Sequence, residues 1–214
     1  MKGNRGIQIS KGRLEAFSDG VFAIAATLVV LGFAPPKLTV ASDATMAHAL
    51  VALWPQYLVY AVSFITIGIM WFNHYALFHH AQHVSYAALV ANLGLLLFVA
   101  FLPFPTALLG QFGLLPTLVI FYSLLMLLIS GCYNVLYYVV KLKPDEPASA
   151  SGFVRTRNAW NTLGPAAYVT AMVFALWSPL MGVLLVAAMA VFYLLPVSVG
   201  AALAAGVPTA GAAD

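Results

Sequence analysis

The chain has 214 residues, of which 63% are hydrophobic and only 7% carry a charge. Soluble domains usually have about a quarter of their residues charged, because their surface must stay in water. A water-soluble domain is therefore excluded, and we expect one membrane domain over residues 1–206 and a flexible tail over 207–214. The formal net charge of +3 is interpreted as a signal of membrane topology and not as a nucleic-acid site.

The first predicted span covers residues 14–34 and contains the apolar run from Gly20 to Ala34. A cleaved signal peptide is the alternative, because small residues follow at Val40, Ala41 and Ser42. Acidic residues precede the apolar run, however, where a signal peptide is normally free of them. We therefore expect the segment to be a retained membrane helix.

The chain from Ala44 to Val140 contains no Lys, Arg, Asp or Glu. One crossing needs roughly 20 to 25 residues, so this stretch must fold back on itself. A polar cluster at 79–83 and a segment rich in Pro and Gly at 103–116 mark the breaks. They predict three spans, near 46–74, 84–108 and 115–140.

A second uncharged stretch runs from 158 to 213, and Trp177, Ser178 and Pro179 indicate a tight reversal within it. This pattern predicts a helical hairpin with spans near 154–176 and 180–204. The predicted fold class is therefore all-α, a polytopic membrane protein with six transmembrane helices.

Basic residues test this count, since Lys and Arg near span ends collect on the cytoplasmic side. The first group is Lys2, Arg5, Lys11 and Arg13, and the second, between the fourth and fifth predicted spans, is Lys141, Lys143, Arg155 and Arg157. Four crossings separate the two groups, so they share a side, and only Lys37 falls on the other. We expect both termini in the cytoplasm and the protein in a cell membrane.

The first predicted helix begins with Arg13, Glu15, Ser18 and Asp19 directly before its apolar run. Ionisable groups at membrane depth are expensive and usually pair or face a bundle interior. Two interpretations remain open. Either these residues only mark the membrane interface, or they form a buried polar cluster with another helix, for which the partners would be Trp71, Asn73 and His74.

The same helix carries Ile24, Leu28 and Leu31 at spacings of four and three, which puts them on one stripe. Such a stripe is normally core packing. It would form hydrophobic rings around a pore only if the helix faced a symmetry axis, which periodicity cannot show. Thr27 could bond back to the carbonyl of Ala23 or point its hydroxyl towards such an axis.

No metal, cofactor or catalytic site is expected. His79, His80 and His83 could in principle bind a metal, but solvated histidines at the membrane interface are the favoured interpretation. Cys132 is the only cysteine, so a disulfide framework and a Cys-based zinc site are excluded. The sequence has no HExxH or GxSxG motif and no paired mid-helix carboxylates, so we expect no enzyme.

The residues Arg13, Phe17, Ser18 and Asp19 match the RxxxFSD signature of the transmembrane protein 175 family of potassium channels, which this sequence resembles. Further matching residues are Trp71, His74 and Phe78, then Asn92, then Leu102, Pro103, Phe104, Pro105 and Thr106. They follow the family's order through the first half of the chain. Beyond about Thr117 only the hydropathy pattern is similar.

The resemblance implies a prokaryotic-type subunit of six helices that assembles as a homotetramer, with the first helix of each subunit lining a central pore. It maps the narrowest hydrophobic constriction onto Ile24 and the next layers onto Leu28 and Leu31, while Thr27 ranks lower. The residues that it assigns to a structural polar network near the cytoplasmic mouth are Arg13, Phe17, Ser18, Asp19, Trp71 and His74.

The expected function is a leak-like potassium-selective cation channel with a hydrophobic gate, with potassium as the permeant ion and no cofactor. The alternative is an ion- or proton-coupled secondary transporter. A transporter normally needs an ionisable residue near mid-membrane, and every acidic residue after Asp19 falls in an expected loop or tail. No TVGYG-like carbonyl filter is present.

Overall fold

The computed structural model describes residues 10–33, 35, 36, 38, 42–79, 81, 84–141 and 151–194, with backbone only at 141, 151–162 and 194. These residues form helices, as the sequence predicts, and the described ranges contain no strand. The helices are α1 (Lys11–Leu28), the 3₁₀ helix η1 (Val29–Gly32), α2 (Asp43–Ala52), α3 (Trp54–His79), α4 (Tyr86–Phe101), α5 (Pro103–Phe112), α6 (Pro116–Lys141), α7 (Ser151–Ala175) and α8 (Pro179–Leu194).

Four helical stretches are long and apolar enough to cross a membrane, namely Lys11–Gly32, Trp54–His79, Tyr86–Phe112 and Pro116–Val140. Two shorter apolar helices are described at Leu163–Ala175 and Pro179–Tyr193. The chain is therefore a multi-pass membrane protein. The six-span count and the cytoplasmic position of both termini stay predictions.

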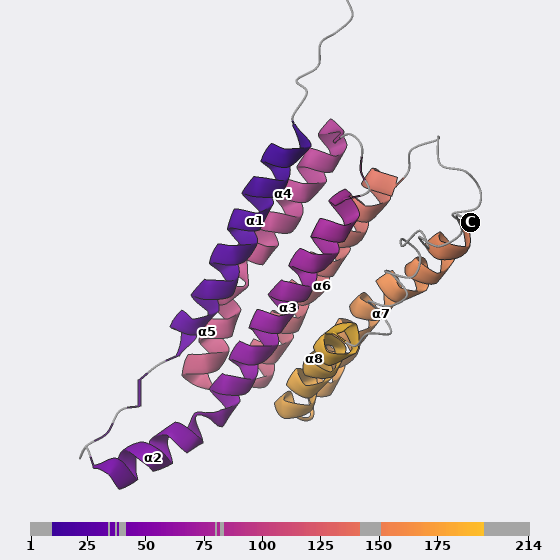
Figure 1. Ribbon diagram of the computed structural model, residues 1–214. Coiled ribbons are helices and arrows are strands. Elements are labelled where there is room, and N and C mark those ends of the chain that lie inside the picture. The colour runs from indigo at the N-terminus through magenta and orange to yellow at the C-terminus, as the bar shows by residue number, and fades with distance from the viewer. Residues whose placement is uncertain are drawn as a thin grey trace, which may run out of the picture.

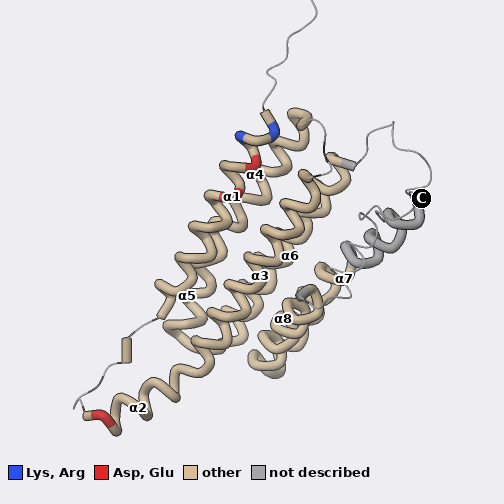
Figure 2. The backbone as a smooth tube through the Cα atoms, viewed as in Figure 1, with Lys and Arg blue, Asp and Glu red and all other residues tan. Residues whose placement is uncertain are grey.

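The helices form one bundle, in which α1 packs against α3 and α4, and α6 packs against α4 and α7 (Figure 1). The short helix α5 continues α4 and packs against η1, while α8 packs against α7 and α3. Figure 2 shows that the charged residues of the described chain lie at the ends of this bundle, on the first turns of α1 and at the start of α2. Among the residues whose side chains are described, no Lys, Arg, Asp or Glu is buried.

The predicted span 46–74 differs from the structure, which divides this segment into α2 and α3. Pro55 has no N–H, so it cannot complete the hydrogen bond to the carbonyl of Val51 that would carry one helix through this point. The N–H of Leu53 instead bonds to Leu50 and Val51, and the chain bends there. Helix α2 points away from the bundle and contains no buried residue (Figure 1).

The predicted span 84–108 is also interrupted, because α4 ends at Phe101 and α5 begins at Pro103. The sequence predicts a break within 103–116, and in the structure the chain reverses near the end of this segment, between Phe112 and Pro116. Gly113 has a φ of 80° and a ψ of −172°, a backbone conformation that is essentially restricted to glycine. The helical stretch therefore continues to Phe112 before the chain turns into α6.

Several predictions fall outside the described residues: those on Lys2, Arg5, Lys37, His80, His83 and Lys143, the end of the sixth span beyond 194 and the tail at 207–214. Arg155 and Arg157 lie on α7 with only their backbone described.

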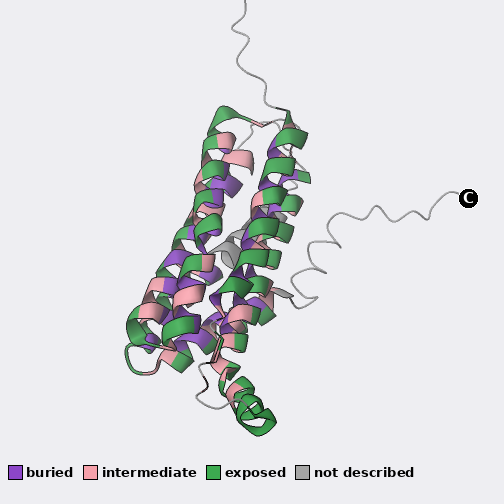
Figure 3. Cartoon of the chain, turned by 90° about the vertical axis from the view of Figure 1, so that its left-hand side faces the viewer, coloured by how far each residue is buried: buried purple, intermediate pink, exposed green. Residues whose placement is uncertain are grey.

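Within the described ranges, buried residues lie where helices meet and exposed ones on the outer surface (Figure 3). That outer surface carries many apolar side chains, among them Val90, Leu93 and Leu97 of α4, as expected for contact with lipid.

Candidate functional site

Helix α1 has one face inside its own subunit and one outside. The inward face consists of Leu14, Ser18, Phe22, Ala25 and, on η1, Val29, which are all buried. On the outward face Ile24, Leu28 and Leu31 have exposed fractions of 60%, 40% and 72%. Figure 3 looks onto the side of the bundle on which α1 lies. The stripe identified in the sequence is therefore not core packing of a single subunit.

A buried hydrogen-bond network joins α1 to α3 and α4. The amide nitrogen of Asn92 donates to the Ser18 hydroxyl at 3.0 Å, and Ser18 donates to the carbonyl of Leu14 at 2.9 Å. The other end of the Asn92 amide, Oδ1, lies 2.8 Å from Nε2 of His74. Because an amide oxygen only accepts, Nε2 of His74 must carry the proton and donate.

All three side chains of this network are fully enclosed, with exposed fractions of 0% for Ser18 and 1% for His74 and Asn92. The rings of Phe22 and Phe78 lie against the imidazole, with centroid distances of 5.4 and 4.7 Å. Hydrogen bonds and ring packing together fix the rotation of α1 relative to α3 and α4. This fixed rotation turns Ile24 and its stripe outwards.

A second contact between α1 and α3 lies closer to the surface. The indole nitrogen of Trp71 donates to Oδ1 of Asp19 at 2.8 Å. A charged acceptor makes such a bond stronger than one between neutral groups. Both residues are exposed in the single chain. The pair therefore lies on the surface of the bundle and not in its interior.

The structure thus brings together Ser18, Asp19, Trp71 and His74 of the six residues predicted for the network. Arg13 and Phe17 are also exposed, and the side chain of Arg13 makes neither an ion pair nor a hydrogen bond within the described chain. Lys11 is the basic residue at the start of α1 that makes such contacts. Its ammonium lies 3.9 Å from the carboxylate of Glu15 and donates to the carbonyl of His79 at 3.4 Å.

Asn92 is the network residue that the prediction of site residues missed. It is the only amide side chain in α4, a helix that is otherwise almost wholly apolar. A lone amide within a membrane span needs a hydrogen-bond partner, since burying it unpaired costs free energy. That signal was available in the sequence, but the identity of the partners was not.

The hydroxyl of Thr27 donates within its own helix, to the carbonyls of Ala23 at 3.1 Å and Ile24 at 2.9 Å. Its single proton is therefore shared between two backbone acceptors. Thr27 lies on the exposed face of α1. On that face the hydroxyl oxygen can still accept a bond, but it has no further proton to give.

A second buried polar cluster lies deeper in the bundle and joins α3, α5 and α6. The hydroxyl of Ser63 lies 3.0 Å from that of Thr106 and 3.0 Å from that of Tyr122. All three residues are buried. The side chains of each polar cluster are hydrogen-bonded to one another, and each cluster thereby joins several helices. Apolar side chains lie between the two clusters.

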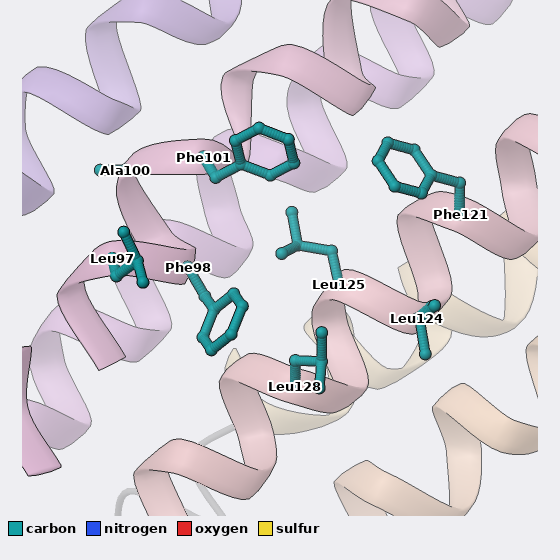
Figure 4. A pocket seen from close by; sticks show the side chains of 8 residues that line it. All are labelled: Leu97, Phe98, Ala100, Phe101, Phe121, Leu124, Leu125 and Leu128. Atoms are coloured by element: carbon teal, nitrogen blue, oxygen red, sulfur yellow. The ribbon is translucent and has the colours of Figure 1, made fainter. Parts of the chain in front are cut away.

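The described residues contain no group of three His, Cys, Asp or Glu side chains that could hold a metal. A pocket of about 500 Å³ lies between α4 and α6. Figure 4 shows Leu97, Phe98 and Phe101 of α4 facing Phe121, Leu124, Leu125 and Leu128 of α6 across it. Since its lining is apolar, it offers no ligand for a cation.

Comparison with known proteins places these features in context. A family profile described as the endosomal/lysosomal potassium channel TMEM175 matches residues 13–103. This range contains the α1, α3 and α4 residues that form the buried network. It ends at Pro103, the first residue of α5.

Related proteins include potassium channels from two bacteria. One from Streptomyces collinus is 38% identical over 162 residues, which cover 72% of this chain and 78% of the relative. One from Chamaesiphon minutus is 43% identical over 109 residues, 51% of this chain and 54% of the relative. The human endosomal/lysosomal proton channel TMEM175 is 40% identical over 101 residues, which cover 44% of this chain and 20% of the human protein.

Solved structures agree with the fold. The crystal structure of a lysosomal potassium-selective channel TMEM175 homolog from Chamaesiphon minutus matches with a TM-score of 0.75 and 31% identity, covering 87% of this chain and 97% of that one. A variant of the potassium channel MtTMEM175 matches with a TM-score of 0.56 and 19% identity, covering 96% and 97%. The second likeness concerns the fold alone.

Proposed function

The chain belongs to the TMEM175 family, and on this premise we propose that it is a subunit of a leak-like, potassium-selective channel in a cell membrane. The observation that carries the proposal is the outward stripe Ile24, Leu28 and Leu31 on a helix that buried hydrogen bonds hold in one orientation. Two bacterial relatives, at 38% and 43% identity, are named potassium channels. We propose no enzymatic role and no cofactor.

The proposed pore lies between copies of the chain and not inside one. A path through a single subunit would need polar groups spaced across the membrane. The described interior instead has two clusters whose polar atoms are bonded to each other, with apolar residues such as Ala25, Ile67 and Leu95 around them. The other buried serine and threonine hydroxyls of the described residues are Thr66, which bonds to its own helix, and Ser123, which stands alone, so they do not form a continuous path. A cyclic arrangement of four copies would bring four α1 stripes around one axis.

In this arrangement Ile24 forms the narrowest ring, and Leu28 and Leu31 form the next layers. Rings of aliphatic side chains oppose water and ions until they wet or dilate, which makes such a constriction a gate. Selection at the ring would act through the cost of removing water from the ion. Thr27 lies between these layers and can offer its oxygen lone pairs to water.

The network of Ser18, His74 and Asn92 would then affect the pore indirectly, by holding α1 in one orientation. A rotation of α1 by one residue position turns a side chain through roughly 100° and would replace Ile24 by a neighbour at the axis. The buried network resists that rotation. Asp19 and Trp71 would add a second anchor nearer the cytoplasmic mouth.

A coupled transporter is the alternative function. It would need an ionisable group that can exchange a proton or ion near mid-membrane. His74 is the buried ionisable candidate on α3, five residues before the helix end at His79. That separation corresponds to a depth of only about 7 Å along the helix. Its imidazole donates to Asn92, which favours a structural role.

The test is ion flux through purified protein in liposomes with opposed potassium and sodium gradients. Passive potassium flux that exceeds sodium flux supports the channel. Uphill flux driven by a proton gradient supports the transporter. Absence of flux of either ion contradicts the channel proposal. Because vertebrate relatives are named proton channels, a pH-sensitive dye inside the liposomes would measure proton entry in the same preparation.

A further inference from the structure

The buried hydroxyl cluster of Ser63, Thr106 and Tyr122 connects to the joint between α4 and α5. Thr106 donates its hydroxyl proton to the carbonyl of Leu102 at 3.0 Å. Since that proton is used, Thr106 must accept from Ser63, and Ser63, having used its own proton, must accept from Tyr122. The protons therefore run in one direction, from Tyr122 through Ser63 and Thr106 to the backbone of Leu102.

This chain of hydrogen bonds ends where two prolines interrupt the backbone hydrogen bonds of the helix. Pro103 and Pro105 lack N–H groups, so the carbonyls of Val99 and Phe101 lose their regular helical donors. The N–H of Leu102 donates to Val99 at 3.1 Å and closes a tighter turn. With fewer backbone bonds across the joint, the position of α5 depends more on the side chains that hold it.

The far side of α5 touches the end of the first helix backbone to backbone. A Cβ atom placed on Gly110 would lie 2.6 Å from the carbonyl oxygen of Gly32, and one placed on Gly32 would lie 2.8 Å from Cα of Ala107. No side chain separates the two segments there. A displacement of α5 towards η1 would therefore push the backbone of η1, which carries Leu31, and a displacement away from η1 would remove its support.

We propose that the hydroxyl chain of Tyr122, Ser63 and Thr106 positions α5 against η1 and thereby sets the place of Leu31 in the pore. The three residues are positioning residues, since none of them reaches the outward face of α1. The proposal rests on the proposed function, because it assigns Leu31 to the pore. It extends the machinery of the channel to α5 and α6, beyond the RxxxFSD signature on α1.

The test compares potassium and sodium flux in liposomes for Tyr122→Phe and Ser63→Ala. Tyr122→Phe removes one hydroxyl and keeps the ring, whereas Ser63→Ala removes the central link and leaves the Tyr122 proton without its acceptor. Loss of one net hydrogen bond corresponds to about a two- to tenfold change in an equilibrium. We expect potassium flux to rise by this factor, with weaker discrimination against sodium and an unchanged oligomer mass, and Ser63→Ala to have the larger effect.

Ser123→Ala is the matched control. Ser123 lies next to Tyr122 on α6 and is fully buried, and its hydroxyl has no hydrogen-bond partner within the described chain. Its removal should leave flux unchanged. Gly110→Ala separates α5 from η1 directly, and the double variant with Ser63→Ala should change flux no more than the larger single variant does, because both act on one contact.

The outcomes separate the two proposals. Absence of flux in the unmodified protein overturns the pore and this inference together. Normal flux in the unmodified protein with unchanged flux in both Tyr122→Phe and Ser63→Ala overturns this inference alone. An equal rise in Ser123→Ala, or multiplication of the two effects in the double variant, also overturns it, because loosening of the core in general would then explain the change.

Discussion

His74 and Asn92 are joined by a hydrogen bond of 2.8 Å in which the imidazole donates and the amide oxygen accepts. The same amide donates to Ser18 from its other end. One side chain of α4 thus satisfies a residue on α3 and a residue on α1. Its removal leaves the buried Nε2–H of His74 unpaired and takes one of the two hydrogen bonds of the Ser18 hydroxyl, which keeps its bond to Leu14.

Asn92→Leu should therefore destabilise the protein strongly. The unpaired imidazole of His74 costs about 1–3 kcal/mol and the lost bond to Ser18 about 0.5–1.5 kcal/mol, so the loss should reach about 1.5–4.5 kcal/mol. Thermal unfolding of the detergent-solubilised protein measures it. Gln111→Leu is the control, because it replaces an exposed amide at the end of α5 with the same side chain. Equal unfolding temperatures for the two variants would contradict the network.

Ile24→Asn should raise potassium conductance and weaken discrimination against sodium, because a ring of amides wets more readily than a ring of isoleucines. Liposome flux or single-channel recording measures both quantities. Val90→Asn is the control, since Val90 is a half-exposed aliphatic residue on the outer face of α4. Unchanged currents in Ile24→Asn would remove this residue from the constriction.

Asp19→Ala should lower the yield of tetramer more than it changes selectivity, because it removes the acceptor of the Trp71 indole and not a residue of the constriction. Native mass spectrometry gives the yield. Asp19→Asn keeps an oxygen that can accept this bond and should retain more tetramer. A large loss of selectivity with normal assembly would instead place Asp19 in the ion path.

Gly113→Ala tests the reversal between α5 and α6. At a φ of 80° and a ψ of −172° a residue with a Cβ atom is strained by about 1–3 kcal/mol, so the unfolding temperature should fall. Gly131 on α6 is the matched glycine, as an added Cβ there meets no atom within 4 Å. Gly131→Ala should be neutral or stabilise by up to about 1 kcal/mol. A fall of the same size in both variants would contradict the turn assignment.

Much of the fold could be predicted because apolar runs and proline or glycine breaks are local signals. Helix α6 lies within one residue of its predicted span 115–140 at each end, and α1 with η1 covers Lys11–Gly32, against a predicted span of 14–34. The bend before α3 was not predicted, since the run from Ala44 onwards is apolar on both sides of Pro55 and hydropathy alone does not register a lost hydrogen bond.

The candidate site was predictable only in part, because the sequence shows which residues share a face and not what that face meets. The spacing of Ile24, Leu28 and Leu31 is equally compatible with a core. Only the three-dimensional packing of Ser18 and Phe22 on the opposite side of α1 shows that the stripe points out of the subunit. Likewise, Asn92 bonds to His74 and to Ser18, which lie 18 and 74 residues away from it along the chain.

The length of α3 has a consequence for the surrounding lipid. Its 26 residues measure about 39 Å along the axis, whereas the hydrocarbon core of a bilayer is about 30 Å thick. The helix must tilt or extend its ends into the headgroup layers, where Trp54 at one end and His79 at the other are well suited. Since α1 is bonded to α3, a thinner or thicker bilayer that changes this tilt would also change the inclination of the helix that carries Ile24. Lipid chain length is thus a physical variable to which conductance should respond.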